Sequence, residues 1–401
     1  MNSPRSALRR YLSFSFAGKI LHLWLLVSLP MVFWSGCDLI DTDPSPSLPG
    51  LATIKLKLTA EAQQTLNANR NLNVFVPADL VYDYPEKGIR ERHSVEIRNA
   101  GQFSRRYFKH SYRLRMPAGR PFRGKTILNL SSQPTDDTKL RSVLGYTVLR
   151  AAGFEVPELE PVAVYINDRY QGLHYLIEPI DRSFFDRRHI PITALFEARM
   201  LEARWSYSNG FNLRLGYAKV FPEDENFSEL DRLIRRITDS TPENIEQNLA
   251  SIFDLQSYIN YTAAQVVIQN FDSWNNNFHL YHDDGLNVMR LQPWDVDHAY
   301  DSEVAIHPST ALNDLIAANL TLRQRYLSRL LELLDGPANP PSLISIVWAE
   351  APRLAEAYDR DPYYRSAGKT MVEQALELEN QIVASHGRLR AEVVRLLAEL
   401  P

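Results

Sequence analysis

The hydrophobic pattern of this chain changes its period once, and that change limits the folds open to it. In the first part, Ile54, Leu56 and Leu58 are separated by lysines, the alternation of a half-buried strand. Beyond Phe221 the apolar residues recur at helical spacing. One such stripe consists of Leu230, Leu233, Ile234 and Ile237. A strand-rich first part followed by a helical second part predicts an α+β fold.

Further elements can be placed within each part. Strands are expected in residues 94–98, 111–115, 127–130, 162–166 and 173–177. The last two form a hairpin with its turn at Asn167-Asp168. Apolar residues at helical spacing predict a helix over residues 136–152. Three or four helices are expected in the tail, residues 311–400.

The N-terminus has the pattern of an export signal. Arg9, Arg10 and Lys19 precede an apolar run over residues 20–34. That run is too short and too interrupted to span a bilayer as a mature helix. We therefore interpret residues 1–36 as a signal peptide, which implies an exported protein.

The only cysteine of the chain follows this run. Trp34-Ser35-Gly36-Cys37 resembles a bacterial lipobox, which implies that Cys37 is lipidated and becomes the mature N-terminus. The alternative is an ordinary thiol near a signal-peptide cleavage site. Residues 37–50 are rich in Asp, Ser and Pro, as in a flexible tether. The sequence thus predicts a protein anchored by lipid to the cell-envelope membrane, facing the periplasm or the outer surface.

The charge distribution argues against a nucleic-acid partner. The whole chain has a net charge of -4, and its first 36 residues contain four basic and no acidic residues, so the remainder carries -8. Nucleic-acid binders normally show clustered Lys and Arg. We therefore expect no nucleic acid among the partners.

The segment with the most chemical information spans residues 269–297. Asp284-Gly285 is a strong signal for a two-residue hairpin turn. Asp272 and Asn277 precede the first strand of this hairpin, and Asp295 follows the returning strand. The hairpin should therefore bring these three side chains close together.

These residue types at this spacing suit phosphoryl transfer. A carboxylate must orient the attacking hydroxyl and accept its proton, while oxygen ligands hold magnesium against the phosphates. In protein kinases the catalytic aspartate precedes a metal-binding asparagine by five positions, and a metal-binding aspartate follows a hairpin. Asp272, Asn277 and Asp295 have that arrangement.

The segment resembles the CotH kinase family, and the likeness covers roughly residues 51–360. Residues 293–297, Pro-Trp-Asp-Val-Asp, match the Pro-Trp-Asp-x-Asp motif of that family directly. Three further blocks are similar to it: residues 109–115 with Arg98, residues 137–144, and residues 166–173 with Glu178.

The resemblance implies a divergent two-lobed, protein-kinase-like fold. Its β-rich N-lobe would span residues 51–190. Its mostly α-helical C-lobe would span residues 191–401 and contain the catalytic hairpin at 269–301. The implied ligands are ATP and magnesium, and the implied partner is a protein with Ser or Thr acceptors.

The resemblance also implies roles for individual residues. Asp272 matches the catalytic aspartate and Asp295 the metal-binding one, with Asn277 and Asp297 as further metal ligands. In the N-lobe, Lys109 is the candidate for phosphate binding with Glu178 as its partner. Arg113 or Arg115 could take the role of Lys109, and Glu178 and Arg141 could instead form ordinary structural ion pairs.

Two other classes of function fit parts of the same segment. Asp295, Asp297, Asp301 and Glu303 could bind calcium in a surface adhesion or structural protein. A pseudokinase would bind nucleotide and transfer nothing. A zinc site at His279, His282 and His298 is disfavoured, because a separation of three on a strand points His279 and His282 to opposite faces.

Overall fold

The computed structural model describes residues 48–102, 104–199, 201–208, 210–363 and 368–401. The expected signal peptide and Cys37 lie outside these residues, so both stay predictions. In the described part of the chain, no helix is long and apolar enough to cross a membrane.

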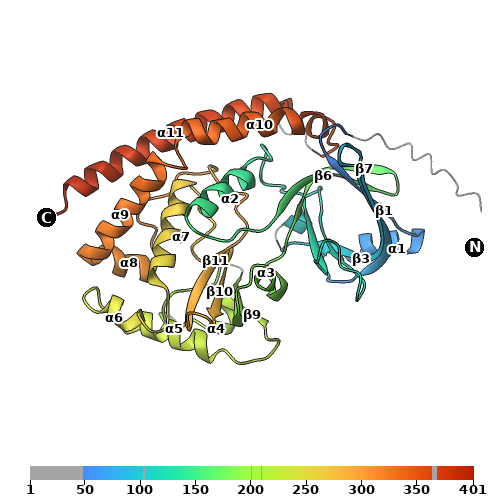
Figure 1. The fold of residues 1–401 in the computed structure, drawn as a ribbon. Coiled ribbons are helices and arrows are strands. Elements are labelled where there is room, and N and C mark those ends of the chain that lie inside the picture. Colours follow the sequence, from blue (N-terminus) through green and yellow to red (C-terminus); the bar gives the residue numbers. More distant parts are fainter. Residues whose placement is uncertain (1–47, 103, 200, 209, 364–367) are drawn as a thin grey trace, which may run out of the picture. The chain divides into compact units, whose positions relative to one another are not determined.

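Seven strands of the first part close into a barrel (Figure 1). They are β1 (Ala52–Lys57), β2 (Val76–Tyr84), β3 (Ile89–Ala100), β4 (Ser111–Arg115), β5 (Ile127–Ser131), β6 (Leu159–Ile166) and β7 (Arg169–Ile177). Their order is β1-β2-β3-β4-β5-β7-β6, and β1 closes the barrel by pairing in parallel with β6. Alternate side chains such as Ile54, Leu114 and Val164 fill the interior, as in other small barrels.

Two helices of this part connect consecutive barrel strands. They are α1 (Ala60–Ala68) and α2 (Arg141–Ala151), with single 3₁₀ turns at Pro85–Lys87 and Ser104–Arg106. The sequence predicted that α2 begins at residue 136, which is wrong by five residues. Lys139 has a left-handed backbone, with φ of 57°, which a right-handed helix excludes. Asp136 instead accepts hydrogen bonds from the backbone N–H groups of Thr138 and Arg141.

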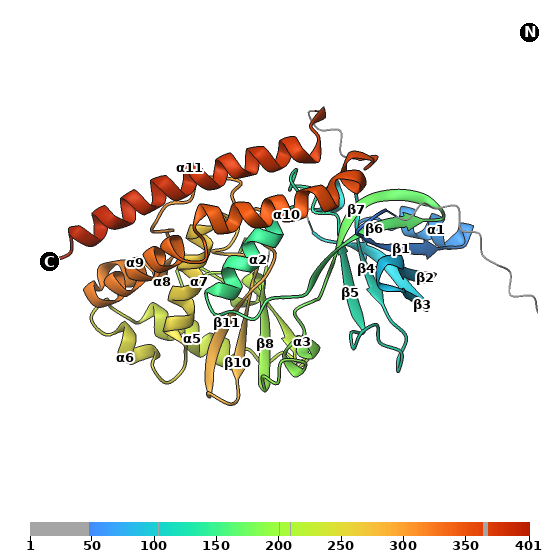
Figure 2. The ribbon, with the colours of Figure 1, turned by 45° about the horizontal axis from the view of Figure 1, so that its top comes forward.

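A second, four-stranded sheet lies in the second part of the chain. Its strands are β8 (Ile192–Ala198), β9 (Tyr217–Phe221), β10 (Phe278–Asp283) and β11 (Val288–Pro293), in the order β11-β10-β8-β9. Strands β11, β10 and β8 are labelled side by side in Figure 2. All neighbours are antiparallel. The sequence predicted the β10–β11 hairpin but not β8, because β8 is buried at most positions and therefore shows no alternation.

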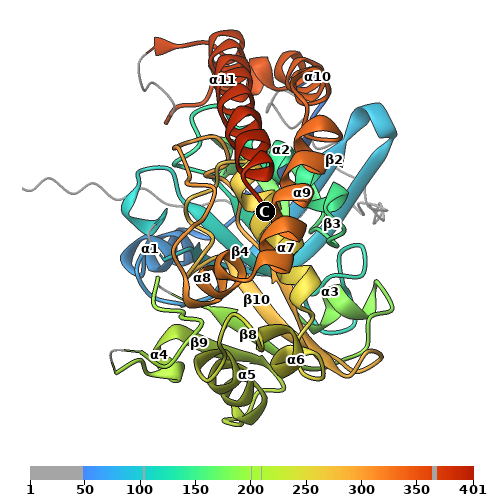
Figure 3. The same cartoon turned by 90° about the vertical axis from the view of Figure 1, so that its left-hand side faces the viewer.

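Helices make up the rest of the second part. They are α3 (Arg182–Asp186), α4 (Leu213–Gly216), α5 (Ser228–Thr238), α6 (Ile245–Leu249), α7 (Leu255–Val267), α8 (Ala311–Ala318), α9 (Leu320–Asp335), α10 (Pro340–Asp359) and α11 (Met371–Ala398). Helix α9 packs against α7 and α11 (Figure 3), and α10 reaches both α2 and β7. The described part of the tail thus contains four helices, within the predicted number.

The predicted α+β class is confirmed. The closure of the first sheet into a barrel was not predicted, since it depends on the pairing of β1 with β6 across more than a hundred residues. Residues Ser45–Pro401 form one compact unit, so the division into two lobes stays a prediction.

Candidate active site

The β10–β11 hairpin places Asn277 beside the segment that begins at Trp294. Phe278 pairs with Pro293 at the open end of the hairpin, and the Trp294 N–H donates to the Asn277 carbonyl oxygen at 3.0 Å. Asn277 and Asp295 both have left-handed backbones, with φ of 58° and 47°. Such conformations are uncommon outside glycine and gather at functional sites.

Asp272 is hydrogen-bonded to Asn277. The Asn277 side-chain N–H donates to Asp272 Oδ2 at 2.8 Å. Two buried aromatic side chains hold the segment between Asp272 and Asn277. The Tyr261 hydroxyl donates to the Ser273 carbonyl oxygen, and the Trp205 indole N–H donates to the Trp274 carbonyl oxygen. Asp272 and Asn277, five residues apart in the sequence, are therefore in direct contact, and the segment between them is held by hydrogen bonds.

Asp272, Asp295 and Asp297 form an acidic cluster. Burial raises the pKa of Asp272, and the Asp297 charge raises it further. Burial and the neighbouring Asp297 and Asp272 carboxylates hold the pKa of Asp295 well above its usual value. Burial also raises the pKa of Asp297, against the opposing effects of His298 and of a hydrogen bond from Thr135. Like charges held this close repel one another, so the cluster favours the arrival of a cation.

Helix α2 packs directly against the segment that carries Asp295 and Asp297. A Cβ atom on Gly145 would lie 2.7 Å from Val296 Cγ2, so glycine is what permits this approach. Burial raises the pKa of the next residue, Tyr146, and the Asp295 charge adds to that effect. The acidic cluster is therefore backed by a helix from the first part of the chain.

Thr135 and Arg141 also reach this segment, and neither was predicted to do so. The Thr135 hydroxyl donates to Asp297 Oδ2 at 3.0 Å. Arg141 Nη1 donates to the Ala299 carbonyl oxygen at 2.7 Å. The sequence offers no signal for either contact, because each joins residues more than 150 positions apart.

The expected ion pair between Lys109 and Glu178 is wrong. Lys109 is buried, and its Nζ lies 2.6 Å from Asp361 Oδ2 and donates to the Leu173 carbonyl oxygen. Glu178 instead pairs with Arg187 and Arg188. Glu178 therefore has the structural role that was its alternative reading. Lys109 joins the barrel to the segment after α10.

We expect Lys109→Met to lower the free energy of unfolding by about 3 kcal/mol, because it leaves the Asp361 carboxylate buried without its cation. The double variant Lys109→Met/Asp361→Leu should recover most of that loss. Urea unfolding of the wild type and the variants measures both effects. If the single variant is as stable as the wild type, the buried pair does not hold these segments together.

Arg113 lies in a group of three guanidinium side chains. It stands directly opposite Arg98 across the β3–β4 pair, and like charges in that position are unfavourable. Arg98 and Arg105 both donate to Asn73 Oδ1 and to the Asn99 carbonyl oxygen. Within the described ranges, the hydrogen bonds of the three guanidiniums go to amide and carbonyl oxygens, and the Glu197 and Asp181 charges act on Arg113, where they oppose the lowering of its pKa by burial. The group is therefore suited to an anion.

The alternative metal ligands do not converge. Asp301 accepts from His298 at 2.9 Å, and Glu303 pairs with Arg388 at 3.2 Å. His282 lies 2.6 Å from the Thr193 hydroxyl. Among the described residues, no group of three or more His, Cys, Asp or Glu side chains is arranged to hold a metal ion, and this holds for Asp272, Asp295 and Asp297 as well.

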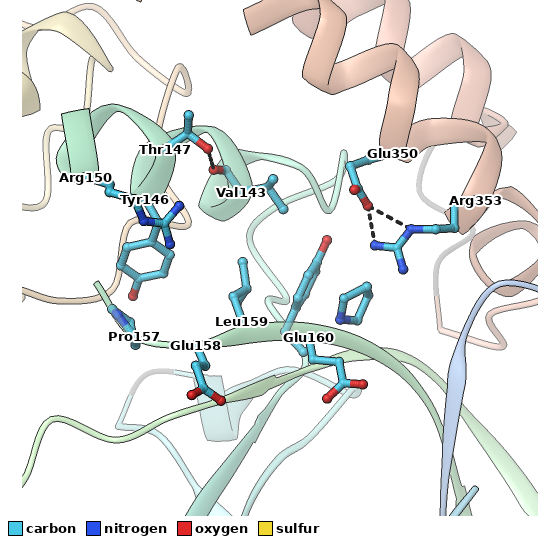
Figure 4. A pocket seen from close by; sticks show the side chains of 12 residues that line it. Val143, Tyr146, Thr147, Arg150, Pro157, Glu158, Leu159, Glu160, Glu350 and Arg353 are labelled. Carbon is cyan, nitrogen blue, oxygen red and sulfur yellow. Dashed lines mark hydrogen bonds and ion pairs between the residues drawn. The ribbon is translucent and has the colours of Figure 1, made fainter. Parts of the chain in front are cut away.

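A cavity of about 430 Å³ has Tyr146 among its lining residues (Figure 4). Its charged lining comes from Arg150 on α2, from Glu158 and Glu160 around the start of β6, and from α10, where Glu350 pairs with Arg353. None of the site residues predicted from the sequence lines it. The cavity therefore shares no lining residue with the acidic cluster.

Comparison with known families decides the assignment. Residues 97–394 match the family described as CotH kinase protein, a span that includes the barrel strands from β4 onward and the whole acidic cluster. The chain belongs to the CotH kinase family. One relative that is similar in sequence is the inner spore coat protein H of Bacillus subtilis (strain 168). It is 23% identical over 300 residues, covering 69% of this chain and 81% of the relative.

Two solved structures are similar at a lower level. The Helicobacter pylori proinflammatory kinase CtkA is 10% identical, with a TM-score of 0.37 over 71% of this chain and 94% of that one. The HipA–HipB–operator DNA complex of Shewanella oneidensis MR-1 is 15% identical, with a TM-score of 0.33. That match covers 68% of this chain and 60%, less than two thirds, of the other. Both scores are too low to carry an argument about this chain.

Proposed function

We propose that this CotH family protein is an atypical kinase that transfers the γ-phosphoryl group of ATP to Ser or Thr hydroxyls. The observation that supports it most is the contact between Asp272 and Asn277 beside Asp295 at the open end of one hairpin. A general base and metal-binding oxygens are the groups that phosphoryl transfer requires from a protein.

In this proposal Asp272 is the catalytic residue. Its carboxylate orients the acceptor hydroxyl and takes its proton as the new O–P bond forms and the bond from the γ-phosphorus to the bridging oxygen breaks. ADP is the leaving group. The hydrogen bond from Asn277 fixes one oxygen of Asp272 at 2.8 Å. That contact keeps the carboxylate in one orientation, which positioned acid–base catalysis requires.

The acidic cluster suits magnesium better than calcium. Calcium takes six to eight oxygen ligands, whereas magnesium is usually held by one or two carboxylates, several waters and substrate phosphates. Asp295 and Asp297 supply such carboxylates, and Asn277 supplies an amide oxygen. Asp301 and Glu303, which a calcium site would need, have cationic or imidazole partners instead. A bound magnesium ion would neutralise charge on the phosphates.

Arginine is a better candidate than Lys109 for binding the phosphates. Lys109 is buried, and Asp361 already compensates its charge. Arg113, the alternative named from the sequence, lies opposite Arg98 on the outer face of the barrel. Guanidinium groups bind phosphate oxygens in a bidentate manner. We therefore assign the phosphate contacts to Arg113 and its neighbours in place of Lys109.

The proposed location outside the cytoplasm rests on the export signal expected in residues 1–36 and on one relative. The Bacillus relative is by name an inner spore coat protein, which supports a surface-associated role for this chain. We propose that the protein acts outside the cytoplasm on exported or surface proteins and is held to the envelope by lipid on Cys37.

The lipid anchor makes a direct prediction. Wild-type protein should partition into the detergent phase and carry acyl chains on its N-terminal residue. Cys37→Ala should remove both properties, since the chain has no other cysteine. Mass spectrometry of the mature N-terminus reads the outcome. An unmodified Cys37 or cleavage elsewhere would overturn the lipoprotein assignment and leave the kinase assignment untouched.

Ligand-dependent stabilisation tests the proposed function. A ligand at a hundred times its Kd adds about 2.7 kcal/mol to the free energy of unfolding. Thermal unfolding with Mg-ATP, with ATP alone and with calcium alone separates a nucleotide-binding protein from a calcium-binding one, and a phosphate-transfer assay then separates a kinase from a pseudokinase. A kinase is stabilised by Mg-ATP most, whereas stabilisation by calcium alone would favour an adhesion or structural protein.

A further inference from the structure

The loop before α2, residues 133–139, touches the acidic cluster through one side chain. The Thr135 hydroxyl donates to Asp297 Oδ2 at 3.0 Å. No other group in the described ranges donates a hydrogen bond to Asp297. One oxygen of this carboxylate is therefore engaged by Thr135, and the other is left for a ligand.

The loop itself is held in a single shape. Lys139 Nζ donates to the carbonyl oxygens of Gln133 and Asp136, which flank Pro134-Thr135. Gln133 and Lys139 both have left-handed backbones, with φ of 42° and 57°. A buried side-chain nitrogen that joins the two sides of so short a loop leaves Thr135 little freedom, and strain of this kind persists only where contacts enforce it.

Neighbouring elements fix this loop against the rest of the protein. The Tyr175 hydroxyl, on β7, donates to the Lys139 carbonyl oxygen at 2.5 Å. The Tyr358 hydroxyl, on α10, donates to the Asp137 carbonyl oxygen at 2.8 Å. The barrel and the C-terminal helices thus both determine where Thr135 lies.

The chain just after Asp297 is held by the same framework. The Arg141 N–H donates to Asp136 Oδ2 at 3.0 Å, and Arg141 Nη1 donates to the Ala299 carbonyl oxygen at 2.7 Å. Two residues near the start of α2 therefore hold the segment that contains Asp297. Thr135 fixes its side chain, and Arg141 fixes its backbone two residues later.

We propose that Thr135 is a positioning residue that orients Asp297 for divalent-cation binding. This inference rests on the proposed function, because it assigns Asp297 to the metal site of the kinase. Groups that hydrogen-bond a ligating carboxylate fix its direction, and their loss typically weakens metal binding 10- to 100-fold. Thr135 acts through Asp297 and needs no contact with the substrate.

Two substitutions at Thr135 distinguish positioning from a purely structural role. Thr135→Val keeps the shape of the side chain and removes the donor, whereas Thr135→Ser keeps the donor. Thr147→Val is the matched control, because the Thr147 hydroxyl donates only within α2, to the Val143 carbonyl oxygen at 2.8 Å. A structural role would lower the melting temperature without changing the affinity for metal.

The experiment measures Mn²⁺ binding by electron paramagnetic resonance in the presence of a non-hydrolysable ATP analogue. Mn²⁺ stands in for magnesium as the spectroscopic probe. We expect Thr135→Val to bind Mn²⁺ about 10- to 100-fold more weakly than the wild type. Thr135→Ser and Thr147→Val should stay within about threefold of the wild type, and the Mg²⁺ concentration for half-maximal transfer should rise in parallel for the valine variant alone.

The outcomes separate this inference from the proposed function. If wild type and Thr135→Val bind Mn²⁺ equally, Thr135 does not position the ligand, and the kinase assignment stands. If the wild type binds no Mn²⁺ with nucleotide, both assignments fall. Thr135→Ala is measured alongside, so that a valine variant that does not fold leaves a second variant from which the same loss is required.

Discussion

Asp272→Asn should lower the rate of phosphate transfer by about 10²- to 10⁴-fold, the range that positioned acid–base groups contribute. The amide cannot take the proton of the acceptor hydroxyl, although it occupies the same space and can still accept the hydrogen bond from Asn277. Because this carboxylate acts mainly in the transition state, the affinity for Mg-ATP should change by no more than a few fold. Transfer rate and ATP affinity are measured on one preparation.

Asp284→Asn is the matched control for this change. It makes the same replacement at the turn of the same hairpin, where Asp284 is exposed, and should transfer phosphate at the wild-type rate. If Asp272→Asn also transfers at that rate, Asp272 is not the catalytic residue. A wild type that binds ATP but transfers nothing would indicate a pseudokinase.

Asp295→Asn should abolish the stabilisation by Mg-ATP and with it phosphate transfer, while the protein stays folded. The fold should tolerate this change because asparagine is among the residues that best accept a left-handed backbone, and Asp295 has φ of 47°. Removing the carboxylate also relieves repulsion from Asp272 and Asp297, whose charges raise its pKa. The melting temperature without ligand should therefore be equal to or above that of the wild type.

Thermal unfolding with and without Mg-ATP measures both parts of this prediction. At a hundred times its Kd, Mg-ATP should add about 2.7 kcal/mol to the stability of the wild type and nothing measurable to the variant. A variant that keeps the full stabilisation and transfers phosphate normally would show that Asp295 is not the ligand. Asp297 would then be the next carboxylate to test in the same way.

The sequence predicted the catalytic hairpin because its determinants are local. The hairpin lies where the sequence placed it, although its loop has four residues, 284–287, in place of the predicted two-residue turn, because Asp283 pairs with Val288. Phe278 meets Pro293 at the open end. Asp272 and Asn277 are only five residues apart, and they are in contact. The proximity of these side chains to Asp295 then follows from the hairpin alone, whereas their catalytic and metal-binding roles stay predictions.

The surroundings of this hairpin depend on contacts between distant residues and could not be predicted. Lys109 pairs with Asp361, which is 252 positions away, and no pattern in the sequence relates the two. The pairing with Glu178 was taken from kinases in general, and the arginines of the short α3 region, Arg187 and Arg188, satisfy Glu178 instead. Ion pairs between elements are set by packing, which periodicity does not reveal.

The start of α2 was predicted wrongly for a different reason. The predicted start at residue 136 lies before the apolar stripe of α2, because residues 136–139 are polar and Leu140 is the first apolar residue of the stripe. The local hydrogen bonds of Asp136 and the left-handed conformation of Lys139 end the helix there. Asp and similar short polar residues offer the backbone this alternative to a helix. The same loop carries Thr135, whose contact with Asp297 joins residues 162 positions apart and therefore has no signal in the sequence.

Phosphate transfer at the acidic cluster can be measured by labelling. The exported form of the protein is incubated with γ-labelled ATP and magnesium together with extracted surface proteins, and mass spectrometry locates the modified residues. We expect phosphate on Ser or Thr residues that appears with the wild type and is absent when magnesium is removed. Labelling that is absent from the wild type, or equal in wild type and Asp272→Asn, would contradict it.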